Sequence, residues 1–294
     1  MNMFRDGLFA GKRILVTGGG TGLGEVMAEA YAKLGAAVYI CGRRASVVEE
    51  TAKRISAETG SQVKGIACDI RGPEAVDEMI SQIWSDGGAL TGLVNNAAAN
   101  FISPTKDLSP RGFNAISDIV FRGTFYVTLA CGKRWIECGT RASVISILTT
   151  WIWNGGPYTV PSAMSKAGLN IMTKSLAVEW APHGIRLNAI APGPFPTKGA
   201  WERLNPDVAA RGDSGAVNPM GRVGQMPELA NLAIFLMADG CDYLTGQTVA
   251  IDGGLHLATG DNFASLAKLG DSEWERIRAA IRSANEKDKS QRGA

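Results

Sequence analysis

The sequence predicts an α/β protein built on a Rossmann-type, doubly wound parallel sheet of about seven strands, with helices on both faces. Two observations support this prediction. Short apolar runs alternate with amphipathic segments along most of the 294 residues, as strands and crossover helices do in parallel sheets. The first apolar run also leads through a glycine-rich turn into a helical pattern, and the turn reads Thr17-Gly18-Gly19-Gly20-Thr21-Gly22-Leu23-Gly24. This strand–turn–helix order is typical of a dinucleotide-binding fold.

The predicted strands are short runs with few polar residues, as expected for strands that are buried on both faces. They lie at residues 12–17, 37–41, 62–67, 93–95, 143–147, 186–190 and 248–251. A helical segment separates each strand from the next, so the connections are crossovers and the strands are expected to run parallel.

The predicted helices are segments in which apolar residues recur every three or four positions. Gly35 ends the first of them, and Pro73 stands at the start of the third. They span residues 25–34, 45–58, 73–84, 161–180 and 228–237, with two further helices between about residues 109 and 137.

The chain is expected to form one domain followed by a tail. No linker or repeat interrupts residues 1–256, which we predict to be a nucleotide-binding domain. The tail, residues 257–294, differs in composition. Within its residues 271–285, Trp274, Ile277 and Ile281 stand at helical spacing among charged residues, which predicts an amphipathic helix.

Composition argues against several classes of function. Thirty basic and 28 acidic residues give a net charge of +2 and are spread along the chain, which argues against a nucleic-acid partner. The five cysteines and two histidines show no metal-ligand spacing, so we predict no metal site and reduced thiols. The start lacks the apolar core of a signal sequence, and no apolar run reaches membrane-spanning length. We therefore expect a soluble cytoplasmic protein with no membrane partner.

The glycine turn predicts a dinucleotide site. Gly18, Gly22 and Gly24 allow a tight turn between strand and helix, and the first N–H groups of that helix can bind a pyrophosphate. Further contacts are expected from the ends of later strands. The predicted cofactor contacts are Thr17, Gly18, Gly20, Thr21, Gly22, Leu23, Gly24, Arg43, Arg44, Asp69, Ile70, Asn96, Ala97, Lys166, Pro192, Gly193, Pro194 and Phe195.

The end of the second strand favours NADP(H) over NAD(H). An acidic residue there would bind the ribose 2′-hydroxyl, whereas this chain has Arg43 and Arg44, and guanidinium groups suit a 2′-phosphate. For Arg44 there is an alternative to cofactor binding: its side chain is simply solvated. Asp69, after the third strand, either accepts a hydrogen bond from the adenine amino group or caps the turn before Pro73.

A second motif, Ser162-Ala163-Met164-Ser165-Lys166, bears on proton chemistry. Oxidoreductases with such a glycine turn usually carry Tyr four residues before this lysine, where both side chains share one helix face and the lysine lowers the pKa of the phenol. Here that position is Ser162. Since it follows Pro161 at a predicted helix start, its hydroxyl either takes part in proton transfer or caps the helix.

Together these residues resemble the short-chain dehydrogenase/reductase family, which shares the glycine turn, Asn95-Asn96-Ala97-Ala98, Lys166 and Pro192-Gly193-Pro194. Within that family, the chain looks most similar to the 2,4-dienoyl-CoA reductases, and the similarity covers nearly the whole chain. The segments that carry it lie at residues 95–104, 160–168 and 191–200, together with the Trp-containing helix near the C-terminus.

The resemblance implies that NADPH delivers hydride to the far carbon of a conjugated dienoyl thioester, and that a proton then arrives nearer the thioester to give a 3-enoyl-CoA. It implies that Asn100 polarises the thioester carbonyl, that Lys166 holds the nicotinamide ribose, and that Ser162 matches a serine of the family. It also implies a homotetramer. Substrate contacts are expected at Arg71, Phe101, Ser109 and Arg203.

One departure from the family pattern concerns the proton donor. The family's active-site tyrosine lies fifteen residues before the lysine, where this chain has Trp151, and an indole N–H donates a hydrogen bond but cannot shuttle a proton. Val120 stands where most members carry Asn. Tyr158, eight residues before the lysine, is the nearby phenol and a candidate acid. Trp151 and Trp153 either line a pocket for a bulky or rigid acyl group or pack at a strand end.

Three functions are therefore considered. The resemblance implies an NADPH-dependent oxidoreductase that reduces a conjugated C=C bond in an unsaturated acyl-CoA. The first alternative is a hydroxy/keto oxidoreductase that uses NAD(P) on an acyl-CoA or alicyclic substrate, with Tyr158 as the acid. The second is a non-catalytic NADP-binding sensor or scaffold, because Ser162 and Trp151 stand where a phenol is expected.

Overall fold

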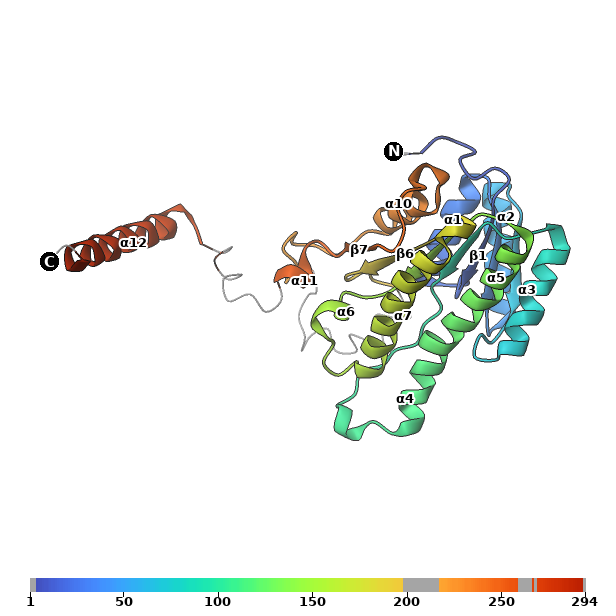
Figure 1. The fold of residues 1–294 in the computed structure, drawn as a ribbon, viewed down its shortest axis with the longest axis horizontal. Helices are drawn as coiled ribbons and strands as arrows, with labels where there is room; N and C mark the ends of the chain where they lie inside the picture. Colours follow the sequence, from blue (N-terminus) through green and yellow to red (C-terminus); the bar gives the residue numbers. More distant parts are fainter. Residues whose placement is uncertain (1–3, 198–216, 259–265, 267–268, 293–294) are drawn as a thin grey trace. The chain divides into compact units, whose positions relative to one another are not determined.

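Seven parallel strands form a sheet at the centre of the first structural unit (Figure 1). The computed structural model describes residues 4–197, 217–258, 266 and 269–292, and its contacts divide the chain into a unit of Met1–His256 and a unit of Leu257–Ala294. The strands are β1 (Arg13–Thr17), β2 (Ala37–Gly42), β3 (Val63–Ala67), β4 (Gly92–Asn95), β5 (Ala142–Ile147), β6 (Ile185–Pro192) and β7 (Thr248–Ile251).

The strand order across the sheet is β3-β2-β1-β4-β5-β6-β7, so the chain winds outward in one direction from β1 and in the other from β4. This order confirms the predicted doubly wound sheet. In such sheets, ligands bind outside the carboxyl ends of the strands at the point where the winding reverses. Here that point lies between Thr17, which ends β1, and Asn95, which ends β4.

Helices cover both faces of the sheet. They are α1 (Gly22–Lys33), α2 (Ala45–Thr59), α3 (Pro73–Gly87), α4 (Pro110–Ser117), α5 (Thr124–Cys138), α6 (Trp151–Asn154), α7 (Val160–Glu179), α10 (Met226–Met237) and α11 (Leu255–Ala258). On one face α1 packs against α2 and α10, and on the other α3 packs against α5, while α7 contacts β6, α4 and α6 (Figure 1).

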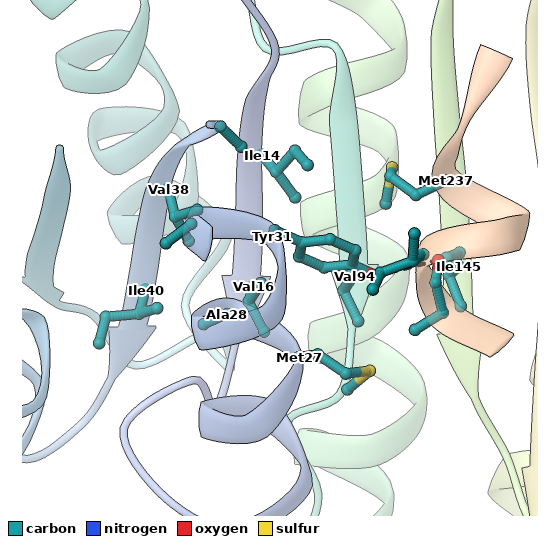
Figure 2. Packing of buried hydrophobic residues seen from close by; sticks show 14 of the residues in the cluster. Ile14, Val16, Met27, Ala28, Tyr31, Val38, Ile40, Val94, Ile145 and Met237 are labelled. Carbon is teal, nitrogen blue, oxygen red and sulfur yellow. Dashed lines mark hydrogen bonds between the residues drawn. The ribbon is translucent and has the colours of Figure 1, made fainter. Parts of the chain in front are cut away.

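The core between α1 and the sheet fixes where the glycine turn lies. Figure 2 shows Met27 and Tyr31 of α1 over the β1 side chains Ile14 and Val16, and all four are fully buried. The Tyr31 hydroxyl donates a hydrogen bond to the Ala233 carbonyl of α10. Burying side chains of this size contributes roughly 1.5–3 kcal/mol each, so α1 is held firmly against the sheet.

The helices expected between residues 109 and 137 differ from the prediction. The chain is helical from Pro110 to Cys138, with a π-helical turn over Asp118–Gly123 that joins α4 to α5. Close packing accompanies this turn, because a Cβ at Gly123 would lie only 2.7 Å from Ile70 Cγ1. Val120 lies buried within the turn. Elsewhere the predicted strands and helices are found, with ends that differ by up to three residues.

The second unit contains α12 (Asp271–Arg292), which extends beyond the predicted helix at 271–285. Trp274 and Ile277 are partly buried, whereas Ile281 is exposed. Across the described part of the chain, no helix combines the length and the apolar character that crossing a bilayer requires.

Candidate active site

The glycine turn between β1 and α1 forms a cradle at the carboxyl edge of the sheet. Gly18 and Gly22 have φ values of 64° and 61°, which side-chain-bearing residues rarely adopt. A Cβ at Gly18 would lie 2.9 Å from Ala97 Cα, and one at Gly24 would lie 2.4 Å from the Gly18 carbonyl oxygen. α1 begins at Gly22, so its first N–H groups and its dipole favour an anion in this turn.

The other predicted residues of the turn have different environments. A Cβ at Gly20 would lie 3.1 Å from Val48 Cγ1, so a side chain there would crowd α2. Thr21 is exposed and precedes α1 without capping it through its hydroxyl. Leu23 is partly buried and packs on the core, so only its backbone belongs to the cradle.

Thr17 and Asn96 tie the end of β1 to the end of β4. The Thr17 hydroxyl accepts hydrogen bonds from the N–H groups of Asn96 and Ala97, both at 3.0 Å, and donates to the Val94 carbonyl. The Asn96 side chain donates to the carbonyls of Thr17 and Gly18 at 3.0 and 3.2 Å. These side chains therefore build the floor of the cradle through bonds within the protein.

The segment that follows β6 is held at the same edge of the sheet. The Gly193 N–H donates to the Ile251 carbonyl at 3.0 Å, and the Pro194 carbonyl accepts from the Gly224 N–H at 2.9 Å. The Phe195 ring is buried against Gly224, where a Cβ would meet it at 2.3 Å. Since the Phe195 ring is used in packing, Pro192 to Phe195 present mainly backbone to the crevice.

Thr197 is a site residue that the sequence prediction did not include. A Cβ at Gly22 would lie 3.6 Å from the Thr197 hydroxyl oxygen, so this hydroxyl lies beside the start of α1. The residue belongs to the family-like segment 191–200, but its spacing from the glycine turn carries no signal. Only the parallel arrangement of β1 and β6 in one sheet brings the two together.

Arg43 and Arg44 follow β2 and are exposed. Among the residues that the structure describes, neither guanidinium makes an ion pair or a hydrogen bond. Arg44 directly precedes α2, and only its carbonyl is used, by the Val48 N–H. Both guanidinium groups are thus available to an anion at the end of β2.

Asp69 and Arg71 bind each other after β3. The Arg71 side chain contacts both carboxylate oxygens of Asp69, at 3.0 Å from Nε and 2.5 Å from one terminal nitrogen. These bonds hold the pKa of Asp69 below its usual value. Ile70 between them is buried against Gly123. The residue expected at the adenine and one expected at the substrate therefore form a single ion pair.

Lys166 lies on α7 with its side chain buried and only 6% of the residue exposed. Its amine donates a hydrogen bond to the Ile147 carbonyl at the end of β5. Burial lowers the pKa of Lys166 from 10.5 to about 8. Since it faces a strand end and has no ion-pair partner among the described residues, this lysine is not a solvated surface residue.

Ser162 lies one helical turn before Lys166, on the same face of α7. The helix begins at Val160 with Thr159 as its N-cap, so the hydroxyl of Ser162 does not cap it. The residue is 5% exposed, and its hydroxyl has no hydrogen-bond partner among the described residues. The Ser162 hydroxyl is therefore available to a ligand.

Asn100 and Phe101 lie in the loop after β4. The Asn100 amide is partly buried and has no hydrogen-bond partner among the described residues. Phe101 packs in a cluster with Val120 and Leu148. The Ser103 N–H donates to the Tyr158 carbonyl at 2.9 Å, which ties this loop to the segment that precedes α7.

The structure says little about substrate binding by two of the predicted contacts, Ser109 and Arg203. Ser109 caps α4, because its hydroxyl accepts a hydrogen bond from the Gly112 N–H at 3.1 Å. This bond gives the residue a structural role and leaves the hydroxyl proton available. Arg203, together with residues 198–200 of the family-like segment, lies outside the described residues.

Trp151 and Tyr158 flank the segment between β5 and α7. The Trp151 ring packs on Gly156, where a Cβ would lie 3.0 Å from the indole. Tyr158 has φ of 64°, a strained value for an aromatic residue, and is 58% exposed. It lies outside α7, so it does not share the helix face of Lys166.

This arrangement fits a nicotinamide adenine dinucleotide. The glycine turn is closely packed, because a Cβ at Gly18 or Gly24 would collide with neighbouring backbone, and so it exposes backbone and no side chain at these positions. The start of α1 suits a pyrophosphate, and Lys166 lies buried at the same carboxyl edge of the sheet. Such a site can transfer hydride between the cofactor and a bound substrate.

Comparison with known proteins agrees with this geometry. A family model described as enoyl-(acyl carrier protein) reductase matches residues 18–256. A probable 2,4-dienoyl-CoA reductase of Caenorhabditis elegans, described as producing (3E)-enoyl-CoA, is 43% identical over 98% of this chain and 94% of its own length. A Bacillus subtilis relative, described as producing (2E)-enoyl-CoA, is 39% identical over 83% of this chain and 96% of its own.

Solved structures agree as well. A gluconate 5-dehydrogenase from Burkholderia cenocepacia, in complex with NADP and tartrate, superposes with a TM-score of 0.79 at 32% identity, over 85% of this chain and 97% of that one. The family model alone covers most of the chain. The chain therefore belongs to the short-chain dehydrogenase/reductase family of NAD(P)-dependent oxidoreductases, and within it is similar to the 2,4-dienoyl-CoA reductases.

Proposed function

We propose that this chain is an NADPH-dependent reductase of a conjugated C=C bond in an unsaturated acyl-CoA. The observation that carries the proposal is a buried Lys166 with the unpaired Ser162 hydroxyl one turn away. A fatty enoyl or dienoyl thioester needs its carbonyl oxygen stabilised as negative charge develops, and this needs a hydrogen-bond donor rather than a phenolic acid. The similarity to 2,4-dienoyl-CoA reductases supports the same class of substrate.

The proposed roles follow from the available groups. When bound, NADPH supplies a hydride to the δ carbon of the dienoyl thioester. The Asn100 amide donates to the thioester oxygen, and Trp151 can add its indole N–H to the same task. Lys166 orients the nicotinamide ribose and contributes positive charge. The Ser162 hydroxyl orders the water that protonates the α carbon, so the remaining double bond lies between the β and γ carbons.

Two guanidinium groups support the choice of NADPH. Arg43 and Arg44 stand at the end of β2 and have no ion-pair partner among the described residues. A 2′-phosphate next to Arg43 would gain charge-assisted hydrogen bonds that NADH cannot make. Asp69 is held by Arg71, so its carboxylate reaches the adenine amino group only together with that guanidinium.

The rival functions have weaker support. A hydroxy/keto oxidoreductase would need an acid near Lys166, and Tyr158 lies outside α7 and is largely exposed. A cofactor sensor would have no use for the unpaired groups of Ser162 and Asn100 at the carboxyl edge. Replacing Tyr158 with Phe and testing carbonyl substrates distinguishes the hydroxy/keto oxidoreductase from the proposed reductase. Any turnover excludes the non-catalytic sensor.

Assembly and location remain predictions. We propose a homotetramer, and exposed apolar side chains on the helical face around α5 and α7 support it, since such residues mark protein contacts. They are Phe121, Phe125, Met164, Ile171 and Val178. We further propose that residues 1–256 hold the cofactor and substrate, that 257–294 form a separate tail, and that the protein acts in the cytoplasm.

The test is NADPH oxidation, followed by absorbance, with 2,4-hexadienoyl-CoA as substrate and NADH as the control cofactor. The proposal expects turnover with NADPH and at least about tenfold lower kcat/KM with NADH. A saturated 3-ketoacyl-CoA serves as the carbonyl control. Turnover of the ketone but not of the dienoyl thioester would reject the proposal in favour of the carbonyl oxidoreductase.

A further inference from the structure

A carboxylate, an imidazole and an indole lie together at the carboxyl edge of the sheet, and none of the three has a role in the proposed reaction. Asp252 lies in the turn that follows β7, and His256 lies in α11, which begins at Leu255. Trp153 comes from α6, far away in the sequence. The imidazole of His256 and the indole of Trp153 are stacked, with ring centroids 4.7 Å apart and an interplanar angle of 27°.

Asp252 holds His256 in one orientation. The carboxylate is buried, with 4% of the side chain exposed, and its Oδ2 contacts His256 Nδ1 at 2.7 Å and the His256 backbone N–H at 2.8 Å. Its Oδ1 accepts from the Gly254 N–H at 3.0 Å. Burial acts to raise the pKa of Asp252, but the bonds from His256 and Gly254 lower it below its usual value. An ionised Asp252 requires the proton of the neutral imidazole to lie on Nδ1.

The turn that carries Asp252 is itself fixed to the predicted cofactor site. A Cβ at Gly193 would lie 2.6 Å from Asp252 Cβ, so the two backbones pack directly. The Asn218 side chain donates to the Asp252 carbonyl at 2.8 Å. Gly253 and Gly254, with φ of 64° and 80°, allow the chain to turn back sharply. His256 therefore extends from a rigid base.

α6 needs an anchor of this kind. It has only four residues, Trp151–Asn154, and a helix this short is not stable by itself. The N–H groups of Ile152, Trp153 and Gly155 donate to carbonyls within residues 149–151. Ile152 packs on the cluster of Leu148 and Val120, which fixes one side of the helix. Trp153, on another side, is 46% exposed, and His256 is the ring that covers it.

We propose that His256 is a positioning residue for the reaction: held by Asp252, it stacks on Trp153, fixes α6, and so places the Trp151 indole N–H at the substrate carbonyl. Residues 151 and 153 lie on the same short helix, so a rotation of α6 that frees Trp153 also moves Trp151. The proposal rests on the proposed function, in which Trp151 assists Asn100. It explains how a chain without the usual phenol keeps a rigid donor at this position.

The anchor can be observed directly because the chain has two histidines. The other, His183, is exposed in the turn between α7 and β6, so His183→Gln assigns the imidazole signals and serves as the matched control. Nitrogen-detected NMR should show the His256 proton on Nδ1, with ring protons shifted upfield by the indole. Trp153→Leu should abolish that upfield shift, and an unshifted His256 ring in the unaltered protein would overturn the anchor.

The kinetic test separates positioning from folding. His256→Asn keeps a donor for Asp252 and removes the ring, so it should fold normally and lower kcat with 2,4-hexadienoyl-CoA by about tenfold. The KM for NADPH should change less than about twofold. His256→Phe keeps the ring and should recover most of the lost kcat. A merely structural role would lower kcat and raise the KM for NADPH together, or change neither.

A double-mutant cycle decides whether His256 acts through Trp151. In a Trp151→Phe background, His256→Asn should have no further effect on kcat, because the indole N–H it positions is already absent. Additive losses would overturn the proposal. The NMR experiment does not depend on turnover, so the two proposals can fail separately. If only the proposed reductase activity is wrong, the protein will not turn over the dienoyl-CoA, but the NMR spectrum will still show the His256–Trp153 stack.

Discussion

Two parts of the candidate site use their polar residues in opposite ways. At the end of β1, the side chains of Thr17 and Asn96 form hydrogen bonds within the protein, and these bonds fix the backbone of the glycine cradle. In the loop after β4 and on α7, the Asn100 amide and the Ser162 hydroxyl have no partner among the described residues. One part is a rigid backbone surface, and the other is a set of available side chains.

This difference indicates how each part would respond to change. A backbone surface tolerates no added atom, so its sensitive positions are glycines whose Cβ would collide. A set of free side chains keeps its fold on substitution and loses rate instead. Mutations in the first part should therefore weaken cofactor binding or stability, and mutations in the second should lower kcat.

The largest expected effect is at Lys166. Lys166→Met should lower kcat/KM by about 1,000-fold, because it removes the buried positive charge next to the developing negative charge. Steady-state kinetics measure it. Lys174→Met, on the exposed side of the same helix, is the matched control and should stay within about twofold of the unaltered enzyme. Equal losses for the two variants would contradict the role of Lys166.

Asn100→Ala should lower kcat by about 100-fold, since one donor to the thioester oxygen is lost. The KM for NADPH should stay nearly unchanged, because the amide is expected to contact the substrate. Asn114→Ala on α4, where the residue is exposed, controls for a general effect of losing an amide. A selective rise in the KM for NADPH would show that Asn100 contacts the cofactor and not the substrate.

Gly18→Ala tests the rigid part. The methyl group would face the Ala97 backbone at 2.9 Å, so NADPH affinity should fall about 30-fold, and the protein should lose about 2 kcal/mol of stability. Gly60→Ala is the matched control, because Gly60 also has a positive φ of 72° but nothing within 4 Å of its Cβ. It should cost about 1 kcal/mol and leave NADPH binding intact. Calorimetry and urea unfolding measure both quantities.

Arg43→Gln should raise the KM for NADPH about tenfold while the KM for NADH changes little, because the 2′-phosphate loses a charge-assisted contact. Arg44→Gln should have a smaller effect if its side chain is solvated. Raising the salt concentration should reduce the difference between the unaltered enzyme and Arg43→Gln. A parallel loss with both cofactors would show that Arg43 does not read the 2′-phosphate.

The smallest expected effect is the pH dependence that Lys166 imposes. Its folded pKa of about 8 lies below the ordinary 10.5, so the cation is lost above pH 8 and kcat/KM should fall about tenfold between pH 7 and 9. The free energy of unfolding should change with pH in the opposite direction to kcat/KM. Between pH 8 and 10.5 the unfolded chain holds a proton that the folded chain has released, so stability rises with pH.

Urea unfolding of Lys166→Met checks this sign. At pH 7 the variant should be more stable than the unaltered protein, because it buries no charge. The difference should shrink as the pH rises from 8 to 10.5, since the folded lysine becomes neutral. A difference that stays constant across this range would show that Lys166 does not titrate there.

Most of the fold could be predicted from the sequence because crossover connections and buried strands leave strong local patterns. The π-helical turn over Asp118–Gly123 could not, since nothing in the local spacing separates it from an ordinary helix end. This π-helical turn accompanies the close packing of Gly123 on Ile70, and a tertiary contact of this kind leaves no local sequence pattern.

The candidate site divides in the same way. The glycine cradle is local, so its residues could be named from a short motif. Whether a side chain is free depends on the folded geometry and not on the residue type: Ser109 caps a helix and Arg71 pairs with Asp69, whereas Ser162 makes no side-chain hydrogen bond among the described residues. The stack of His256 on Trp153 joins two segments about a hundred residues apart, and no sequence pattern marks it.

The position of isotope in the product tests the central claim most directly. The dienoyl thioester is reduced with NADPH deuterated at the transferring carbon, and separately with ordinary NADPH in deuterated water. We predict that the cofactor deuterium appears on the δ carbon and the solvent deuterium on the α carbon of a 3-enoyl-CoA. Cofactor deuterium on a carbinol carbon, or none transferred at all, would contradict a reductase that works without a phenolic acid.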